Sequence, residues 1–170
     1  MRTLLLSEGL QKDFHIIYLS RELEGSQNHL IEERGFELKV LRTMECEEMM
    51  EAIKSLSPAL CIVDHYEITP QCEEKIRSLC KLLVFDDDLR PHNADIVLNH
   101  SIFARKNEYD YLSDTVIFAG SDYTLLKPGF VAHQNRFIPI RHLKNKKVLI
   151  ALGGTDVLNL SLPIKKALLS

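Results

Sequence analysis

The sequence predicts an α/β fold with a Rossmann-like parallel sheet, and three observations support this prediction. From residue 14 onward, short runs rich in β-branched and aromatic residues alternate with segments of helical periodicity. The apolar runs that end near residues 63, 85 and 152 are each followed by a cluster of polar residues. A chain of 170 residues, 45% of them hydrophobic, can also bury the core of about one domain.

Strands are expected where short apolar runs are bounded by turn residues, at residues 14–19, 36–41, 60–64, 81–85, 95–99, 116–119 and 148–152. Helices are expected between them. Ser26 is a candidate N-cap of a helix that ends at Gly35. Residues 45–56 carry apolar side chains at helical spacing, and Pro70 fits the first turn of a helix that runs to about residue 80.

The two ends of the chain suggest an incomplete pair of domains. Residues 3–10 have helical spacing with no strand before them, whereas the first strand of a doubly wound sheet is usually central. Residues 134–147 are polar and basic, which is typical of a linker. We therefore expect a Rossmann-like domain at 1–133 that lacks its first strand, a linker at 134–147, and the start of a truncated second domain at 148–170 that contains only its first β-α unit.

Composition excludes several classes of protein. The formal net charge of -3, with Lys and Arg scattered along the chain, gives no basic surface for a nucleic acid duplex. The apolar runs are far shorter than the ~20 residues that span a bilayer, so no membrane contact is expected. Cys46, Cys61, Cys72 and Cys80 form no C-x-x-C pair, which favours a reduced, cytoplasmic protein.

The first polar cluster is Asp64-His65-Tyr66, which combines a carboxylate, an imidazole and a phenol. Together they could supply a proton acceptor, its orienting partner and a hydroxyl that donates to a substrate oxygen. A purely structural interpretation is nearly as strong: Asp64 caps the following turn, His65 faces solvent and Tyr66 packs on Pro70.

The second cluster, Asp86-Asp87-Asp88, could in principle bind a divalent cation through carboxylate oxygens. Consecutive residues point in different directions, however, so capping and turn formation explain three adjacent aspartates better than a metal site does. His92 and Asn99 are further polar residues expected at the same edge of the sheet.

The third cluster, Gly153-Gly154-Thr155-Asp156, follows an expected strand and precedes an expected helix. Such a turn lets the backbone approach a diphosphate. It lacks the lysine of a P-loop, and Gly-Gly turns with Thr or Asp caps also occur without any ligand.

In order along the chain, five motifs resemble those of the UDP-2,4-diacetamido-2,4,6-trideoxy-β-L-altropyranose hydrolases of pseudaminic acid biosynthesis. They are IVDHY at 62–66, FDDD at 85–88 with PHNAD at 91–95, LN at 98–99, GSDY at 120–123 with LLKPGF at 125–130, and GGTD at 153–156 with NL at 159–160.

The resemblance implies a two-domain fold of the GT-B glycosyltransferase type, in which the N-terminal domain holds the sugar and the C-terminal domain holds most of the UDP. It also implies metal-independent hydrolysis at the anomeric carbon with inversion, and no cofactor. The family's Gly-x-Gly-His loop, which supplies the general base, is absent here, since the family's next helix matches this chain from about Arg2. We therefore expect the chain to be catalytically inactive and only marginally stable.

The resemblance implies a catalytic role for Tyr66. The chemistry and position of the polar clusters give the other expected roles: Asp64 is expected to be catalytic, with His65 a weak substitute for the missing base. Substrate contacts are expected from His65, Asp86, Asp87, Asn99 and Lys127, and nucleotide contacts from Gly153, Gly154 and Thr155.

Two other functions remain open. A GT-B glycosyltransferase would be favoured by a membrane-docking surface, for which residues 136–141 are the one candidate, although a linker explains them better. A non-catalytic nucleotide-sugar-binding module is supported by the missing histidine.

Overall fold

The computed structural model describes residues 2–43, 45–133, 148–152, 156 and 158–169. It divides into two compact units, Met1–Lys127 and Pro128–Ser170. The first unit is a mixed α/β structure with parallel sheets and is Rossmann-like, as predicted.

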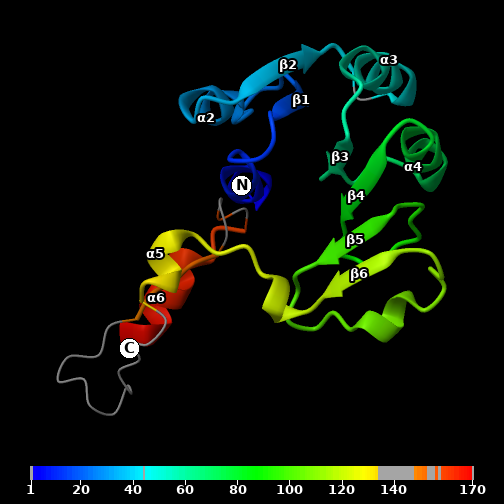
Figure 1. Ribbon diagram of the computed structural model, residues 1–170. Helices are drawn as coiled ribbons and strands as arrows, with labels where there is room; N and C mark the ends of the chain where they lie inside the picture. Colours follow the sequence, from blue (N-terminus) through cyan, green and yellow to red (C-terminus); the bar gives the residue numbers. More distant parts are fainter. Residues whose placement is uncertain (1, 44, 134–147, 153–155, 157, 170) are drawn as a thin grey trace. The chain divides into compact units, whose positions relative to one another are not determined.

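The strands found among the described residues lie in the first unit and form two parallel sheets (Figure 1). The two-stranded sheet pairs β1 (Ile17–Arg21) with β2 (Glu37–Leu41). The four-stranded sheet has the order β3-β4-β5-β6, with β3 (Leu60–Val63), β4 (Lys81–Phe85), β5 (Ile96–Asn99) and β6 (Val116–Ala119). The expected strands at 81–85 and 116–119 are thus confirmed to the residue, and β1 begins later than expected.

Helices cover the sheets of the first unit. They are α1 (Arg2–Leu10), α2 (Asn28–Glu33), α3 (Cys46–Leu56) and α4 (Pro70–Arg77). Pro70 occupies the first turn of α4 as predicted, and the Thr69 hydroxyl caps this helix by accepting the Cys72 N–H. Ser26 does not cap α2, because its hydroxyl donates to Glu22 instead.

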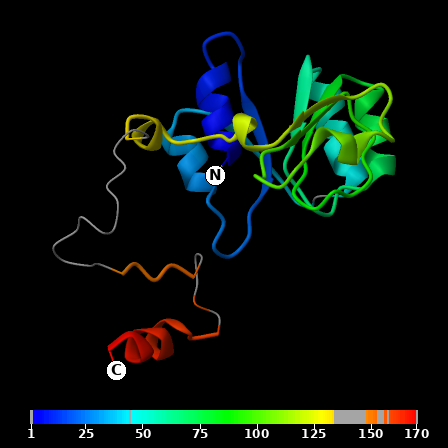
Figure 2. The ribbon, with the colours of Figure 1, turned by 90° about the horizontal axis from the view of Figure 1, so that it is seen from below.

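Two apolar clusters hold these layers together. In one, Leu4 of α1 and Ile31 of α2 pack with Phe36, and side chains of β1 and β2 pack against them. Figure 2 shows the ribbons of α1 and α2 near each other. The larger cluster joins α3 and α4 to β3–β6 and reaches Leu41 of β2, with Leu19 of β1 packed against it. Both sheets therefore share apolar packing with α3 and α4.

The remaining elements are short. In the first unit they are the 3₁₀ helices η1 (Lys106–Tyr109) and η2 (Ser121–Tyr123); the second unit has α5 (Pro128–Val131) and α6 (Ser161–Leu169). Among the described residues, no helix is both long and apolar enough to cross a membrane.

The expected strand at 148–152 is not formed. A strand is stable only when a neighbour accepts and donates its backbone hydrogen bonds, and the described part of the second unit contains no other strand. Leu149 is accordingly 88% exposed. The expected linker at 134–147 lies outside the described residues.

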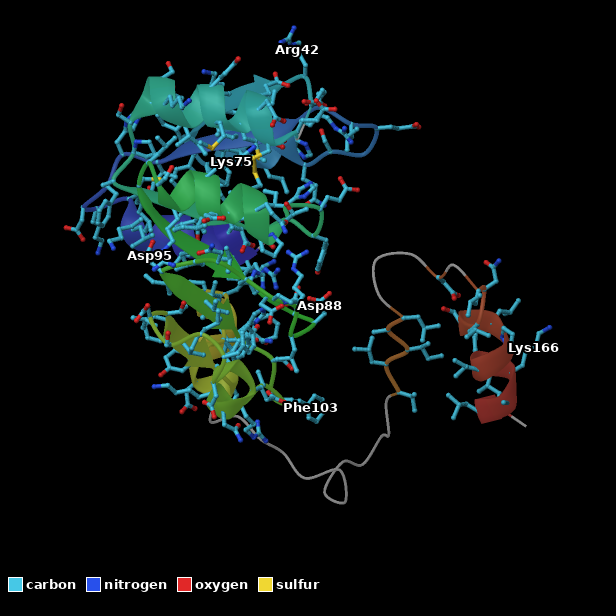
Figure 3. The ribbon with its side chains drawn as sticks, turned by 90° about the vertical axis from the view of Figure 1, so that its right-hand side faces the viewer. Arg42, Lys75, Asp88, Asp95, Phe103 and Lys166 are labelled. Atoms are coloured by element: carbon cyan, nitrogen blue, oxygen red, sulfur yellow. A yellow bond between two sulfur atoms is a disulfide. The ribbon has the colours of Figure 1, made fainter. Side chains whose placement is uncertain are left out.

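The cysteines also differ from expectation. Cys46 and Cys72 form a disulfide between the first turns of α3 and α4 (Figure 3), whereas Cys61 and Cys80 are free. The expectation of a fully reduced chain is therefore wrong for the structure. Because the pair is 26 residues apart, its proximity depends on the packing of two helices and is invisible in the cysteine spacing.

The disulfide should contribute measurably to stability. Since it closes a loop with a sequence separation of 26, its reduction should lower the free energy of unfolding by about 3 kcal/mol. Urea unfolding with and without dithiothreitol measures this, and Cys80→Ser is the control that leaves the bridge intact. Alkylation of all four cysteines in the absence of reductant would contradict the pairing.

Candidate functional site

The polar clusters after β3, β4 and β5 lie at one edge of the four-stranded sheet. Val63 pairs with Val84 and Phe85 pairs with Leu98, so the three parallel strands end side by side. Asp64 and Asp86 directly follow their strands, and Asn99 is the last residue of β5. We call this edge the rim.

Arg2 of α1 joins two of the rim loops. Its guanidinium donates to both carboxylate oxygens of Asp64, from Nη2 to Oδ1 at 2.5 Å and from Nε to Oδ2 at 3.1 Å. Its Nη1 donates to Asp87 Oδ1 at 2.5 Å, and the group lies 4.7 Å from the centre of the Phe85 ring. Burial opposes the charge of Arg2, but the two carboxylates outweigh it and raise the pKa of Arg2.

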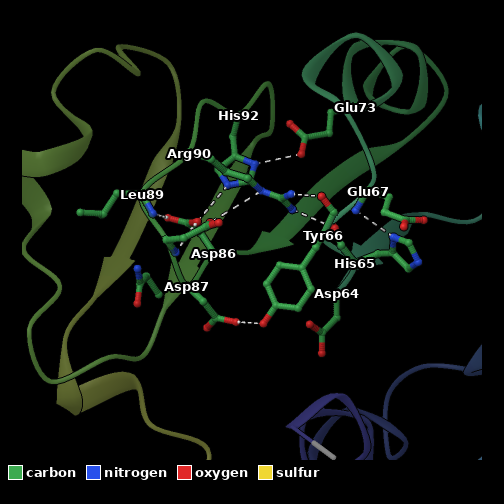
Figure 4. Close-up of polar contacts among 12 residues, drawn as sticks. Asp64, His65, Tyr66, Glu67, Glu73, Asp86, Asp87, Leu89, Arg90 and His92 are labelled. Carbon is green, nitrogen blue, oxygen red and sulfur yellow. Dashed lines mark hydrogen bonds and ion pairs between the residues drawn. The ribbon is translucent and has the colours of Figure 1, made fainter.

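Tyr66 also contacts Asp87. Its hydroxyl donates to Asp87 Oδ2 at 2.7 Å (Figure 4), which raises the pKa of the phenol. Hydrogen bonds from Arg2 and Tyr66 in turn hold the pKa of Asp87 below its ordinary value, even though partial burial opposes this. The Tyr66 side chain is 66% exposed, so its ring is accessible to a ligand.

The backbone around Tyr66 is held by Arg90. The guanidinium of Arg90 donates to the carbonyl oxygens of His65 and Tyr66 and lies 5.8 Å from the centre of the Tyr66 ring. His65 Nδ1 accepts the N–H of Glu67 at 3.1 Å, so the imidazole stabilises its own turn. The loops after β3 and β4 are thereby connected both through Arg90 and through Tyr66.

A buried polar cluster lies behind these exposed groups. His92 Nδ1 is 2.9 Å from Glu73 Oε1, and His92 Nε2 is 3.4 Å from Asp86 Oδ1, an ion-pair distance without hydrogen-bond geometry. The Tyr109 hydroxyl donates to Asp86 Oδ2 and accepts from Asn99 Nδ2 at 2.9 Å. We call Glu73, Asp86, His92, Asn99 and Tyr109 the buried network.

The charges of the buried network stabilise one another. Burial alone would lower the pKa of His92, but the carboxylates of Asp86 and Glu73 raise it to about 9. Burial likewise opposes ionisation of Asp86, yet His92, Tyr109 and the Asp88 N–H keep its pKa below the ordinary value. A charged imidazole therefore lies between two carboxylates in a site closed to solvent.

The other predicted site residues have different surroundings. Asp88 has an exposed carboxylate 4.0 Å from Arg90, and Lys127 is exposed at the end of the first unit. Asp86 and Asn99 are only 1% and 2% exposed, so their side chains offer no surface to a ligand in this structure. Gly153, Gly154 and Thr155 lie outside the described residues.

No group of three or more metal-ligating side chains converges within the described part of the chain. The three adjacent aspartates point to different partners: Asp86 to the buried network, Asp87 to Arg2 and Tyr66, and Asp88 to Arg90. Asp156 accepts the N–H groups of Leu160 and Ser161 at the start of α6.

A hollow of about 380 Å³ also opens on the first unit, beside the loop that follows Tyr66. Arg21 at the end of β1, Thr43, Glu67, Thr69 and the disulfide line it. The Nε of Arg21 is buried and has no hydrogen-bond partner among the described residues. None of the rim residues Arg2, Asp64, Tyr66 or Asp87 lines this hollow.

Sequence reasoning missed the roles of Arg2, Glu73, Arg90 and Tyr109. Arg2 comes from a helix far from the rim in sequence, and Tyr109 comes from η1, for which no periodic pattern exists. Glu73 was hidden by its position in α4, because a helical glutamate is usually exposed, whereas this one is 1% exposed. Of these four residues, only Arg90 could have been found from the sequence, because it lies two positions after the three adjacent aspartates.

The charge of His92 should make stability depend on pH. The pKa of His92 is about 9 in the folded chain and 6.5 is the ordinary value of a histidine, so the stabilisation is complete below pH 6.5 and is lost as the pH rises through 9. Urea unfolding should show a decrease on the order of 3 kcal/mol over this range. His92→Gln should remove this slope, and His15→Gln, at an exposed histidine, should retain it. Parallel slopes for all three proteins would mean that His92 is neutral when folded.

Comparison with known proteins adds to this geometry. No protein-family model matches the chain. Over 86% of its length it is 34% identical to a UDP-2,4-diacetamido-2,4,6-trideoxy-β-L-altropyranose hydrolase of Campylobacter jejuni, covering 52% of that protein. Over 99% of its length it is 31% identical to an uncharacterized protein of Methanocaldococcus jannaschii, covering 36% of it. The chain thus spans about half or less of these relatives, and the first similarity supports the family that the motifs indicate.

Proposed function

We propose that this chain is the sugar-binding part of a hydrolase that acts on a UDP-linked 2,4-diacetamido-2,4,6-trideoxy hexose, releasing UDP and the free sugar. The similarity to the Campylobacter hydrolase over most of the chain supports the substrate class. The observation that carries the proposal is the exposed cluster of Arg2, Asp64, Tyr66 and Asp87 at the rim.

The hydrogen bonds of this cluster fit a neutral, polar sugar. Because the Tyr66 hydroxyl gives its proton to Asp87, its free lone pair points to solvent and can accept an O–H or N–H. A trideoxy sugar with two acetamido groups offers such donors. The carboxylates of Asp64 and Asp87 outnumber the single guanidinium of Arg2, so this cluster has a net negative charge that would repel a diphosphate. We therefore place the sugar at the rim and the UDP on the second domain, where Gly153, Gly154 and Thr155 are the candidate contacts.

Hydrolysis requires a water oxygen to attack the anomeric carbon, a base to take its proton, and the bond from that carbon to the UDP oxygen to break. Neither candidate base at the rim is well placed. Both oxygens of Asp64 accept hydrogen bonds from Arg2. His65 Nδ1 already accepts the Glu67 N–H, so the proton of the neutral ring is on Nε2 and neither ring nitrogen is free to accept a proton from water. We propose that the base comes from a Gly-x-Gly-His loop outside this chain, and that the reaction inverts without a metal.

The same proposal explains the split sheet. Among the described residues, β1 pairs only with β2 and β3 pairs only with β4, while Leu19 and Val63 belong to the same apolar cluster. One further parallel strand between β1 and β3 would join the two sheets. The loop after that strand would then precede α1 and lie close to Arg2, as the GT-B-type fold of the family requires.

One alternative has a specific observation in its favour. Since Asp64 and His65 are both engaged, the chain as given could bind a nucleotide sugar without hydrolysing it. The glycosyltransferase alternative depended on residues 136–141, which lie outside the described part of the chain.

Binding of the UDP-sugar to residues 1–170, measured by isothermal titration calorimetry, tests the proposal. Tyr66→Phe removes one hydroxyl and almost no packing, so it should weaken binding of the altropyranose substrate roughly 3- to 10-fold. Tyr123→Phe is the matched control, because the Tyr123 ring packs on Phe118 and its hydroxyl makes no side-chain hydrogen bond within the described part of the chain.

UDP alone should bind equally to the three proteins, and release of UDP from the substrate should be close to the uncatalysed rate. Failure of the chain to bind the substrate would refute the proposed function. Equal affinities of the wild type and Tyr66→Phe would remove Tyr66 from the site.

A further inference from the structure

The turn that follows β4 has an unusual backbone. Leu89 adopts a φ of 60°, in the left-handed region that a branched side chain rarely occupies. Its side chain is exposed and so does not hold the turn by packing. Such a conformation persists only where surrounding interactions fix it.

Asp86 provides those interactions. Its Oδ1 accepts the N–H of Asp88 at 3.2 Å and its Oδ2 accepts the N–H of Leu89 at 3.1 Å. The carboxylate therefore reaches across Asp87 and closes the turn onto the two residues that follow it. Because Asp87 lies between Asp86 and these two N–H groups, the direction of its side chain depends on where the Asp86 carboxylate is held.

The Asp86 carboxylate is held in turn by the buried network. His92 contacts one oxygen, the Tyr109 hydroxyl donates to the other, and Asn99 donates to Tyr109. Glu73 of α4 fixes the position of His92 through Nδ1 and also accepts the Asn93 N–H at 2.6 Å. These residues come from α4, η1, the end of β5 and the loop after β4, and of them His92 and Tyr109 contact Asp86 directly. Figure 4 shows His92 between Glu73 and Asp86.

The geometry points to a positioning role for the buried network: Asp86, held by Tyr109 and His92, sets the turn that presents Asp87 to Tyr66, and none of the network residues contacts the ligand. Its buried side chains have no free surface for a sugar. The inference rests on the proposed function only insofar as the Tyr66–Asp87 pair is the binding group. It reassigns Asp86 and Asn99 from substrate contacts to support of the neighbouring carboxylate.

Two neighbouring tyrosines provide a matched test. Tyr109→Phe removes the hydroxyl that donates to Asp86, and Tyr111→Phe removes a hydroxyl that donates to the Arg90 carbonyl at 3.0 Å. Their rings are 6.5 Å apart, so both changes delete one oxygen from the same region. The readout is the ¹³Cζ chemical shift of Tyr66 at pH 7 in protein labelled at tyrosine, which reports donation of the phenol to a carboxylate. Tyr123 serves as the internal reference, and Tyr66→Phe identifies the resonance.

In the wild type and in Tyr111→Phe, the Tyr66 resonance should differ from that of Tyr123. In Tyr109→Phe this difference should be lost and substrate affinity should fall by a similar factor to that of Tyr66→Phe. A folded Tyr109→Phe protein with an unchanged Tyr66 resonance would overturn the positioning role. If Tyr109→Phe does not fold, Glu73→Gln, which keeps the shape but removes one charge, decides by the same readout.

The two proposals fail in different ways. Loss of the Tyr66 signal in Tyr109→Phe, in a protein that binds no UDP-sugar in any form, would leave the positioning role intact and refute the proposed function. Normal substrate binding together with an unchanged Tyr66 signal in Tyr109→Phe would support the proposed function and refute the positioning role.

Discussion

The central interaction of this protein is the contact of the His92 imidazole with two buried carboxylates, Glu73 and Asp86. An isolated charge in such a place would be expelled or neutralised, so all three groups depend on one another. Because Glu73 belongs to α4 and Asp86 follows β4, the ion cluster fixes a helix to the end of a strand. These charges therefore contribute to the position of the loop after β4, together with the apolar packing of Ala94 in the same loop.

The exposed part of the rim depends on that loop. Asp87 emerges from it to meet Tyr66 and Arg2, and Arg90 emerges from it to hold the backbone of residues 65 and 66. Arg2 connects both loops to α1, which packs by Leu4 against the apolar cluster beside β1 and β2. The rim therefore has a rigid interior and an accessible surface, the combination that a binding site for a polar ligand needs.

The local sequence pattern predicts some of this structure and fails where the conformation depends on contacts with residues far away in the sequence. The apolar runs at 81–85 and 116–119 become β4 and β6 because neighbouring strands pair with them, whereas the equally apolar run at 148–152 has no partner strand in the described part of the second unit. The sequence does not distinguish the adjacent residues Asp86 and Asp87. Their side chains point in opposite directions, so Asp86 is buried whereas Asp87 reaches the surface and contacts Tyr66. The roles of Tyr109 and of the Cys46–Cys72 pair depend on tertiary contacts alone.

The claim that the rim binds the sugar can be tested directly by mapping amide chemical shifts of the ¹⁵N-labelled chain during titration with the UDP-linked altropyranose and, separately, with UDP. The account predicts that residues 64–66 and 86–90, together with Arg2, respond to the nucleotide sugar and not to UDP. Sugar-dependent shifts confined to the hollow lined by Arg21, Thr43 and Thr69, with residues 64–66 and 86–90 unaffected, would contradict it.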